Sequence, residues 1–170
     1  MIGVGEEFPE FYMQAVTGDE IIEFDFEDLY NQWSVIYFYP KDFTFICPTE
    51  IQGFDNLVGI VDNVVGISPD NEYCKLAWKQ HNELVELICP THILAADSDN
   101  ELANILGIVS GEGVPYRATY VIDPENIIQH VSVNALDTGR NPEEIYRTIE
   151  ALQAGGLTGC SWRKGDDFVA

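Results

Sequence analysis

The chain has 170 residues, 46% of them hydrophobic and 12% aromatic, which is enough apolar material for one domain with a substantial core. Its 29 acidic and 8 basic residues give a net charge of −21, which argues against nucleic acid and anionic membranes as partners, because phosphate binding needs clustered Lys and Arg. No apolar run approaches the ~20 residues that span a bilayer, and the opening residues lack a basic region followed by an apolar stretch, so we expect a cytoplasmic location.

The acidic residues are spread along the chain, at 6–7, 23–28 and 166–167 among other places, and form no acidic tail. Such a distribution is typical of a solvated, self-repelling surface. Adaptation to high salt and selection of a basic partner are alternatives that the sequence leaves open.

The first half of the chain predicts three strands and a helix around one long loop. Residues 11–16 and 21–24 are expected to be short strands on either side of a turn. Residues 33–39 form a nearly continuous β-branched and aromatic run, which is typical of a central strand buried on both faces. Pro40 ends this strand. After a loop, a helix is expected from Cys47 to about Gly59, since proline is tolerated in a first helical turn.

The second half alternates strands and helices. The expected elements are a strand at 63–68, a helix at 70–87, a strand at 91–97, a short helix at 100–106, strands at 118–123 and 127–133, and a helix at 141–153 with Asn141 as its N-cap. This order predicts one α/β domain with a mixed sheet, parallel early and antiparallel late. A Gly-rich stretch predicts that residues 1–154 form the domain and residues 155–170 a flexible C-terminal tail.

Four cysteines stand at positions 47, 74, 89 and 160, and no pair has C-x-x-C spacing. The three histidines are remote from them in sequence, so no zinc pattern is present. A disulfide framework is not expected in a chain of this length without a signal peptide. The question is therefore which cysteine is reactive.

Cys47 is the strongest candidate because it is expected to open a helix. Its sulfur would lie among unpaired backbone N–H groups at the positive end of the helix dipole, an environment that favours a thiolate. The same N–H groups can stabilise oxygen during substitution at an O–O bond. Position alone leaves an inert, buried cysteine as an equal alternative.

The surrounding residues favour the reactive alternative. The segment Pro40-x-x-x-Thr44-x-x-Cys47, followed by Pro48-Thr49-Glu50, resembles the peroxidatic signature of the peroxiredoxin family. The longer string FYPKDFTFICPTEI is similar to the branch that contains the peroxidase subunit of alkyl hydroperoxide reductase. Further matching strings follow in the same order as in the family: GISPD, LAWKQHN, RATYVIDP and TGRN.

The resemblance implies roles for particular residues. Cys47 would attack the peroxide, Pro40 would shield the thiolate, and Thr44 would hold the peroxide oxygen with its hydroxyl. Arg117 would favour the thiolate and polarise the O–O bond, which suits a guanidinium with several donors in one plane. Glu50 and Arg140 match positions that orient this arginine.

The resemblance also implies a second thiol. The string Cys160-x-Trp162-x-Lys164-Gly165 resembles the resolving segment of typical two-cysteine peroxiredoxins, in which the resolving thiol comes from the other subunit of a dimer. The residues beside Cys160 are Gly and Ser, whereas the family usually has Val and Pro there. Cys74 and Cys89 are expected to have packing or surface roles, because neither opens a helix.

The expected protein is thus a thioredoxin-like α/β domain with the peroxiredoxin additions. It would reduce hydrogen peroxide and organic hydroperoxides through a Cys47 sulfenic acid and an intersubunit disulfide with Cys160, without metal, haem or flavin. Its electron donor would be a dithiol protein: thioredoxin, a flavoprotein disulfide reductase or a small helical disulfide reductase. Its assembly would be a homodimer and a ring of dimers. The alternatives are a redox-sensing or chaperone-like oligomer, and a one-cysteine peroxidase in which Cys160 is incidental.

Overall fold

The computed structural model describes all residues, 1–170, and contains one seven-stranded sheet. The strands run in the order β2-β1-β5-β4-β3-β6-β7 across the sheet. Their bounds are β1 Tyr12–Thr17, β2 Glu20–Asp25, β3 Ser34–Phe38, β4 Asn63–Ser68, β5 Ile93–Ala96, β6 Arg117–Ile122 and β7 Ile128–Asn134. The helices are α1 Cys47–Asp55, α2 Glu72–His81, α3 Glu83–Glu86, α4 Glu101–Leu106 and α5 Pro142–Ala154, with a 3-10 turn η1 at Phe26–Leu29.

The sheet is mixed, as the order of elements predicts. Strands β5, β4 and β3 are parallel neighbours at its centre. Antiparallel pairs flank them on both sides, β1 with β2 and β5 on one side, and β6 with β3 and β7 on the other. The sequence predicted the late antiparallel strands, and the structure shows a second antiparallel pair at the opposite edge.

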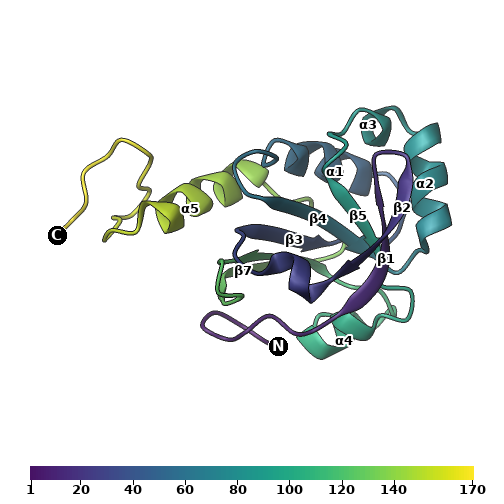
Figure 1. Cartoon of the computed structure of the whole chain (residues 1–170), viewed down its shortest axis with the longest axis horizontal. Helices are drawn as coiled ribbons and strands as arrows, with labels where there is room; N and C mark the ends of the chain where they lie inside the picture. The colour runs from purple at the N-terminus through teal and green to yellow at the C-terminus, as the bar shows by residue number, and fades with distance from the viewer.

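Helices cover both faces of this sheet (Figure 1). Side chains of α1, α2, α3 and α5 form one hydrophobic core, and side chains of α4 and η1 belong to the other. Strand β3 contributes to both, because Val35 and Tyr37 point into the first core while Ile36 and Phe38 point into the second. This alternation confirms the prediction of a central strand buried on both faces.

The prediction of one helix over residues 70–87 is wrong, because the structure has two helices there. Asn82 separates α2 from α3 with an extended backbone, and its side-chain oxygen accepts hydrogen bonds from the N–H groups of Leu84 and Val85. Asparagine competes with helix continuation by capping a new first turn in this way. The helix that begins at Cys47 is also shorter than expected and ends at Asp55, before a turned segment that contains Gly59 with φ +86°.

After α5, the last sixteen residues form no helix or strand and extend from the end of that helix (Figure 1). They nevertheless contain local structure. The Trp162 ring stacks on Phe168 with centroids 5.9 Å apart, and the indole N–H donates to the carbonyl of Asp166 over 3.1 Å. None of the helices combines the length and apolar character needed to cross a bilayer.

Close packing in the first core gives a testable prediction at Gly66, in the central strand β4. A Cβ at this position would lie 2.5 Å from the Tyr37 hydroxyl oxygen. We therefore expect Gly66→Ala to lower the free energy of unfolding by about 1–3 kcal/mol, measured by urea denaturation. Gly111→Ala is the matched control, since no atom lies within 4 Å of its Cβ position. A neutral Gly66→Ala would contradict the packing described here.

Candidate active site

Cys47 is the first residue of α1 and is completely buried. The segment from Tyr39 to Ile46 connects it to β3, so the thiol sits at the carboxyl end of a central strand. The residue that caps the helix, Ile46, offers no side-chain oxygen to the first turn, and Pro48 follows the cysteine. The positive end of the helix dipole is therefore left to act on the sulfur.

Arg117, the first residue of β6, is the direct partner of the thiol. One of its terminal nitrogens donates to the Cys47 sulfur over 3.4 Å and to Glu50 Oε2 over 2.7 Å. Its Nε donates to the carbonyl of Leu136 over 2.6 Å, which fixes the plane of the guanidinium. Burial disfavours the charge, but the interactions with Cys47 and Glu50 outweigh it and raise the pKa of Arg117. A permanent cation thus faces the sulfur.

Glu50 joins two arginines in this site. It lies on the first turn of α1, and its side chain is 2% exposed. Arg140 donates to it from Nε over 2.9 Å, from a terminal nitrogen over 2.8 Å and from its backbone N–H over 3.0 Å. Burial opposes ionisation of this carboxyl, but the hydrogen bonds and charges of Arg140 and Arg117 outweigh it and lower the pKa of Glu50.

Arg140 is itself held by β6 and by the aromatic core. Its other terminal nitrogen donates to the Ala118 carbonyl over 2.9 Å and to the Thr119 hydroxyl over 3.3 Å. Its guanidinium carbon lies 5.1 Å from the centre of the Phe54 ring and 5.3 Å from that of Tyr37. Such contacts suit a guanidinium, which stacks on aromatic faces. Arg140 therefore positions Glu50 and, through it, Arg117.

A cavity of ≈ 350 Å³ opens beside this cluster. It is lined by Pro40, Lys41, Thr44, Phe45, Ile46, Glu112, Val114, Arg117, Leu136 and Asp137. Pro40, Thr44 and Arg117 thus share one cavity, although they come from two separate parts of the chain. The Thr44 hydroxyl donates to the Lys41 carbonyl over 2.9 Å, which leaves its oxygen free to accept a hydrogen bond. This volume is within the range of sites that bind small molecules.

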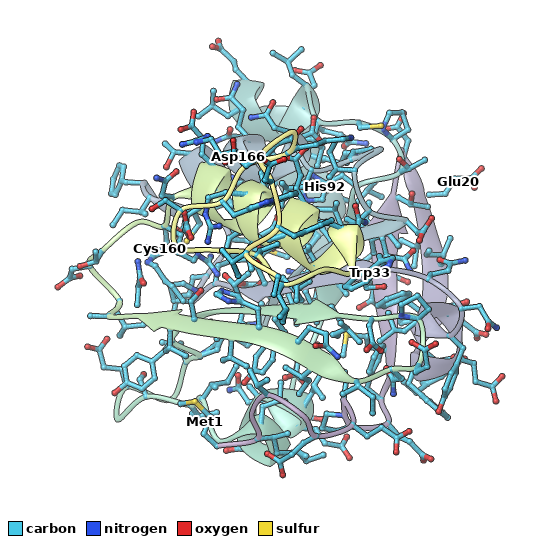
Figure 2. All side chains as sticks on the ribbon, turned by 90° about the vertical axis from the view of Figure 1, so that its left-hand side faces the viewer. Met1, Glu20, Trp33, His92, Cys160 and Asp166 are labelled. Carbon is cyan, nitrogen blue, oxygen red and sulfur yellow. The ribbon has the colours of Figure 1, made fainter.

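Cys160 is not part of this cluster. It is exposed on the C-terminal tail, where Figure 2 shows it at the surface beside α5. It shares a cavity with Arg147 of α5, which donates to the Trp162 carbonyl over 3.1 Å and so ties the tail to the helix. All four cysteines are free thiols in this structure.

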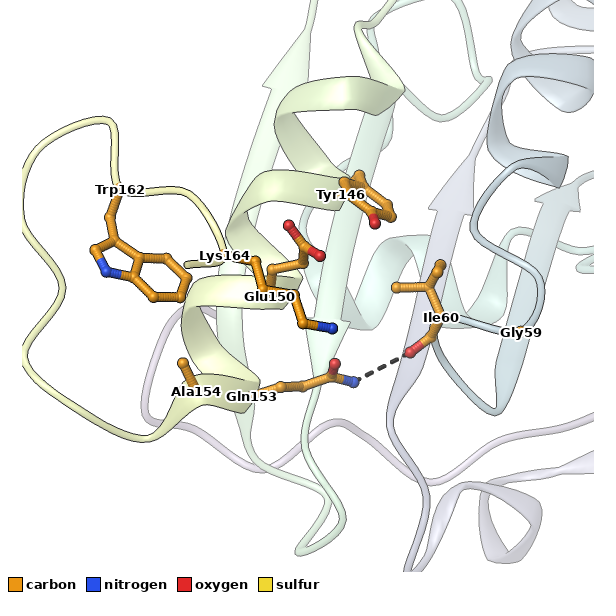
Figure 3. A pocket seen from close by; sticks show the side chains of 8 residues that line it. All are labelled: Gly59, Ile60, Tyr146, Glu150, Gln153, Ala154, Trp162 and Lys164. Carbon is orange, nitrogen blue, oxygen red and sulfur yellow. Dashed lines mark hydrogen bonds between the residues drawn. The ribbon is translucent and has the colours of Figure 1, made fainter. Parts of the chain in front are cut away.

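A separate cavity of ≈ 380 Å³ lies between α5, the segment Gly59–Ile60 and the tail (Figure 3). Gln153 donates to the Ile60 carbonyl across it over 3.2 Å, and Trp162 and Lys164 of the tail complete its lining. The smaller cavity is the one connected to the Cys47 thiol, because its lining includes Arg117, which donates to the sulfur. Its lining shows that the tail packs against the last helix.

Two buried polar networks were missed by the sequence analysis. His92, which the sequence analysis described only as remote from the cysteines, hydrogen bonds to the Tyr37 hydroxyl over 2.8 Å and to Asp55 over 2.9 Å. Lys75 pairs with Asp42 in the loop that precedes Cys47. Helical spacing could have predicted the burial of Lys75, because Lys75 stands three residues before the buried Trp78 and therefore lies on the same face of the helix.

Comparison with known proteins agrees with this geometry. The model of the AhpC/TSA family matches residues 4–131. Alkyl hydroperoxide reductase C of Mycolicibacterium smegmatis is 37% identical, over 99% of this chain and 94% of that protein. Among solved structures, Mycobacterium tuberculosis AhpC has a TM-score of 0.85 at 30% identity, covering 96% of this chain and 99% of the other. A reduced 2-Cys peroxiredoxin of Plasmodium vivax has a TM-score of 0.89 at 32% identity, covering 98% and 92%. These matches confirm the thioredoxin-like fold.

The charge on Glu50 gives a prediction about stability. Glu50→Gln leaves two buried guanidinium groups without their carboxylate, so we expect the free energy of unfolding to fall by about 3–5 kcal/mol near neutral pH. Because the folded chain lowers the pKa of Glu50 below its ordinary 4.5, the ionised carboxyl stabilises the fold above that pH, and this stabilisation is lost as the pH falls below it. The difference between wild type and variant should therefore shrink under acid conditions.

Urea unfolding of both proteins between about pH 3 and pH 7 measures this difference. Glu86→Gln, on the exposed surface of α3, is the matched control and should show no comparable effect. A difference between wild type and Glu50→Gln that stays constant with pH would contradict an ionised Glu50 in the folded chain.

Proposed function

The chain belongs to the AhpC/TSA family and is a thiol-dependent peroxidase of the peroxiredoxin type, and we propose that Cys47 attacks the peroxide and Cys160 resolves the product. The first assignment rests on the contact of the Arg117 guanidinium with the Cys47 sulfur. This contact lies at the N-terminus of α1, beside a cavity that Arg117 also lines. The relatives named above are an alkyl hydroperoxide reductase and a 2-Cys peroxiredoxin, which supports a hydroperoxide as substrate.

In the proposed first step, the Cys47 thiolate attacks one oxygen of the hydroperoxide. An S–O bond forms and the O–O bond breaks, so that Cys47 becomes a sulfenic acid and the leaving oxygen takes up a proton to become water or an alcohol. Thr44 accepts a hydrogen bond from the bound hydroperoxide. Arg117 donates to the oxygen on which negative charge develops, while Pro40 limits the access of water to the sulfur.

In the second step, the Cys160 thiolate attacks the sulfenic sulfur. An S–S bond forms, the S–O bond breaks, and the leaving hydroxide takes up a proton to become water. Cys47, the first residue of α1, is completely buried, whereas Cys160 is exposed on the tail, so the first turn of the helix must open before the two sulfurs meet. We assign residues 1–154 to the peroxidase domain and residues 155–170 to the tail that delivers the resolving thiol.

The disulfide must be reduced to two thiols before another cycle. We propose a dithiol protein as the electron donor: thioredoxin, a flavoprotein disulfide reductase or a small helical disulfide reductase. A reducing compartment such as the cytoplasm supplies such donors. We further propose a homodimer in which the tail of one protomer serves the Cys47 of its partner, and a ring of such dimers.

Substitution of each cysteine tests the cycle. Cys47→Ser should abolish peroxide consumption, because the nucleophile is gone. Cys160→Ser should complete one turnover and then stall with a thioredoxin-type donor, since no disulfide forms. On a non-reducing gel the oxidised wild type should run as a dimer, and both variants as monomers. Steady turnover by Cys160→Ser would favour a one-cysteine peroxidase, and turnover by Cys47→Ser would overturn the assignment of the nucleophile.

The role of Thr44 gives a separate prediction. Thr44→Val keeps the shape of the side chain and removes the hydroxyl that would hold the peroxide. We expect the rate constant for oxidation of Cys47 by hydrogen peroxide to fall by about a hundredfold, measured in single-turnover experiments. Thr91→Val is the matched control and should react at the wild-type rate. Thr91 belongs to the triplet Cys89-Pro90-Thr91, which has the same three residues as positions 47–49. Equal rates for Thr44→Val and wild type would remove Thr44 from the site.

A further inference from the structure

Lys75 is a charged side chain with no exposure to solvent. It lies on α2, and the side chain of its partner Asp42 is equally buried. Burial raises the pKa of Asp42 and lowers that of Lys75, so each charge depends on the other for its stability. A buried pair of this kind is costly to assemble and often contributes little net stability. The pair is therefore expected to have a role other than a contribution to the free energy of unfolding.

The hydrogen bonds of the pair are complete. The Lys75 ammonium lies 3.3 and 3.4 Å from the two Asp42 carboxylate oxygens, and it donates to the Tyr39 hydroxyl over 3.1 Å and to the Ser68 hydroxyl over 2.5 Å. Asp42 also accepts from the Tyr39 hydroxyl over 2.8 Å. The backbone N–H of Asp42 donates to Asp70 over 2.7 Å. The network therefore ties the loop after β3 to the end of β4 and to α2.

Asp42 stands in the middle of the loop that shapes the peroxide cavity. It follows Pro40 by two residues and precedes Thr44 by two, and both of those residues line the cavity. Between Asp42 and Thr44, Phe43 adopts a left-handed backbone with φ 54°, which is unfavourable for a bulky side chain. Such a conformation persists only where its surroundings hold it. The ring of Phe43 rests 5.8 Å from that of Trp78, and the Asp42 side chain supplies the buried anchor immediately before it.

We infer that the buried Asp42–Lys75 pair is a positioning device for the peroxide cavity, which keeps Phe43 left-handed and thereby presents the Thr44 hydroxyl to the substrate. This inference rests on the proposed function, since it assigns the pair to the first chemical step. Neither residue lines the cavity, so both act through the loop. Breaking the pair should slow oxidation of Cys47 and leave the later disulfide step intact. The disulfide step begins with opening of the first turn of α1, which directly follows the loop that the pair holds.

The test compares the reduced full-length wild type with Lys75→Met and Asp42→Asn. Lys75→Met removes the ammonium, while Asp42→Asn keeps the shape and an acceptor oxygen and is the milder change. Single-turnover stopped-flow fluorescence with hydrogen peroxide separates oxidation of Cys47 from disulfide formation. We expect at least about a tenfold slower oxidation in Lys75→Met, a smaller loss in Asp42→Asn, and a disulfide step as fast as in wild type or faster.

Asn126→Ala is the matched control for lost stability. Asn126 is completely buried, has φ 65° and donates to the Phe8 carbonyl over 3.1 Å, so alanine there is strained and loses a hydrogen bond. It lies beyond Ile122, which pairs with Ser34 at the opposite end of β3 from the loop. Urea unfolding places all variants on one stability scale, and Asn126→Ala should oxidise at the wild-type rate.

Three results would overturn the inference: wild-type oxidation rates in every folded variant of the pair, equal slowing of both steps, or slowing in Asn126→Ala in proportion to its lost stability. If Lys75→Met does not fold, Asp42→Asn alone decides between these results. A wild-type protein whose Cys47 is not oxidised by hydrogen peroxide would instead defeat the proposed function. The two failures are thus distinguishable.

Discussion

The contact between the Arg117 guanidinium and the Cys47 sulfur is the interaction on which the rest of the site depends. A buried cation requires a buried anion, and Glu50 supplies it from the same helix that begins with the cysteine. The same carboxylate accepts three hydrogen bonds from Arg140, which packs on the aromatic core. The charge balance around the thiol therefore comes from the same ion pairs and hydrogen bonds that connect α1 to β6.

Under the proposed cycle, this arrangement lets Cys47 react with a hydroperoxide while it is completely buried. In this structure the sulfur lies at the N-terminus of α1 beside the Arg117 guanidinium, and the proposed hydroperoxide would bind in the adjoining cavity. Resolution by an exposed thiol such as Cys160 needs a second state, in which the first turn of α1 has opened. In the proposed cycle, the polar groups that surround Cys47 in this structure are thus the ones that would separate before the second step.

The buried ion pairs of Lys75, Arg117 and Arg140 form two groups, and both groups lie where β3 ends. The Asp42–Lys75 pair ties the loop to β4 and α2, and the Glu50 cluster ties the helix after the loop to β6. In the loop between them, Phe43 has a left-handed backbone conformation. The sequence could not predict this conformation, because phenylalanine by itself disfavours a positive φ and tertiary contacts impose it here. The break at Asn82 was likewise missed, because periodic apolar residues continue through it and only its capping hydrogen bonds divide the helix.

The sequence by itself determined the elements with strong local signals. These elements are the doubly buried strand β3, the helix that starts at Cys47 and the helix capped by Asn141. The sequence motifs around Cys47 also indicated the family to which the chain belongs. Only the tertiary structure decided the partners of buried charges: Lys75 with Asp42, and His92 with Tyr37 and Asp55. The physical reason is that hydrophobic periodicity and capping act over a few residues. A buried charge, in contrast, is satisfied by whichever polar group the fold brings within hydrogen-bond distance.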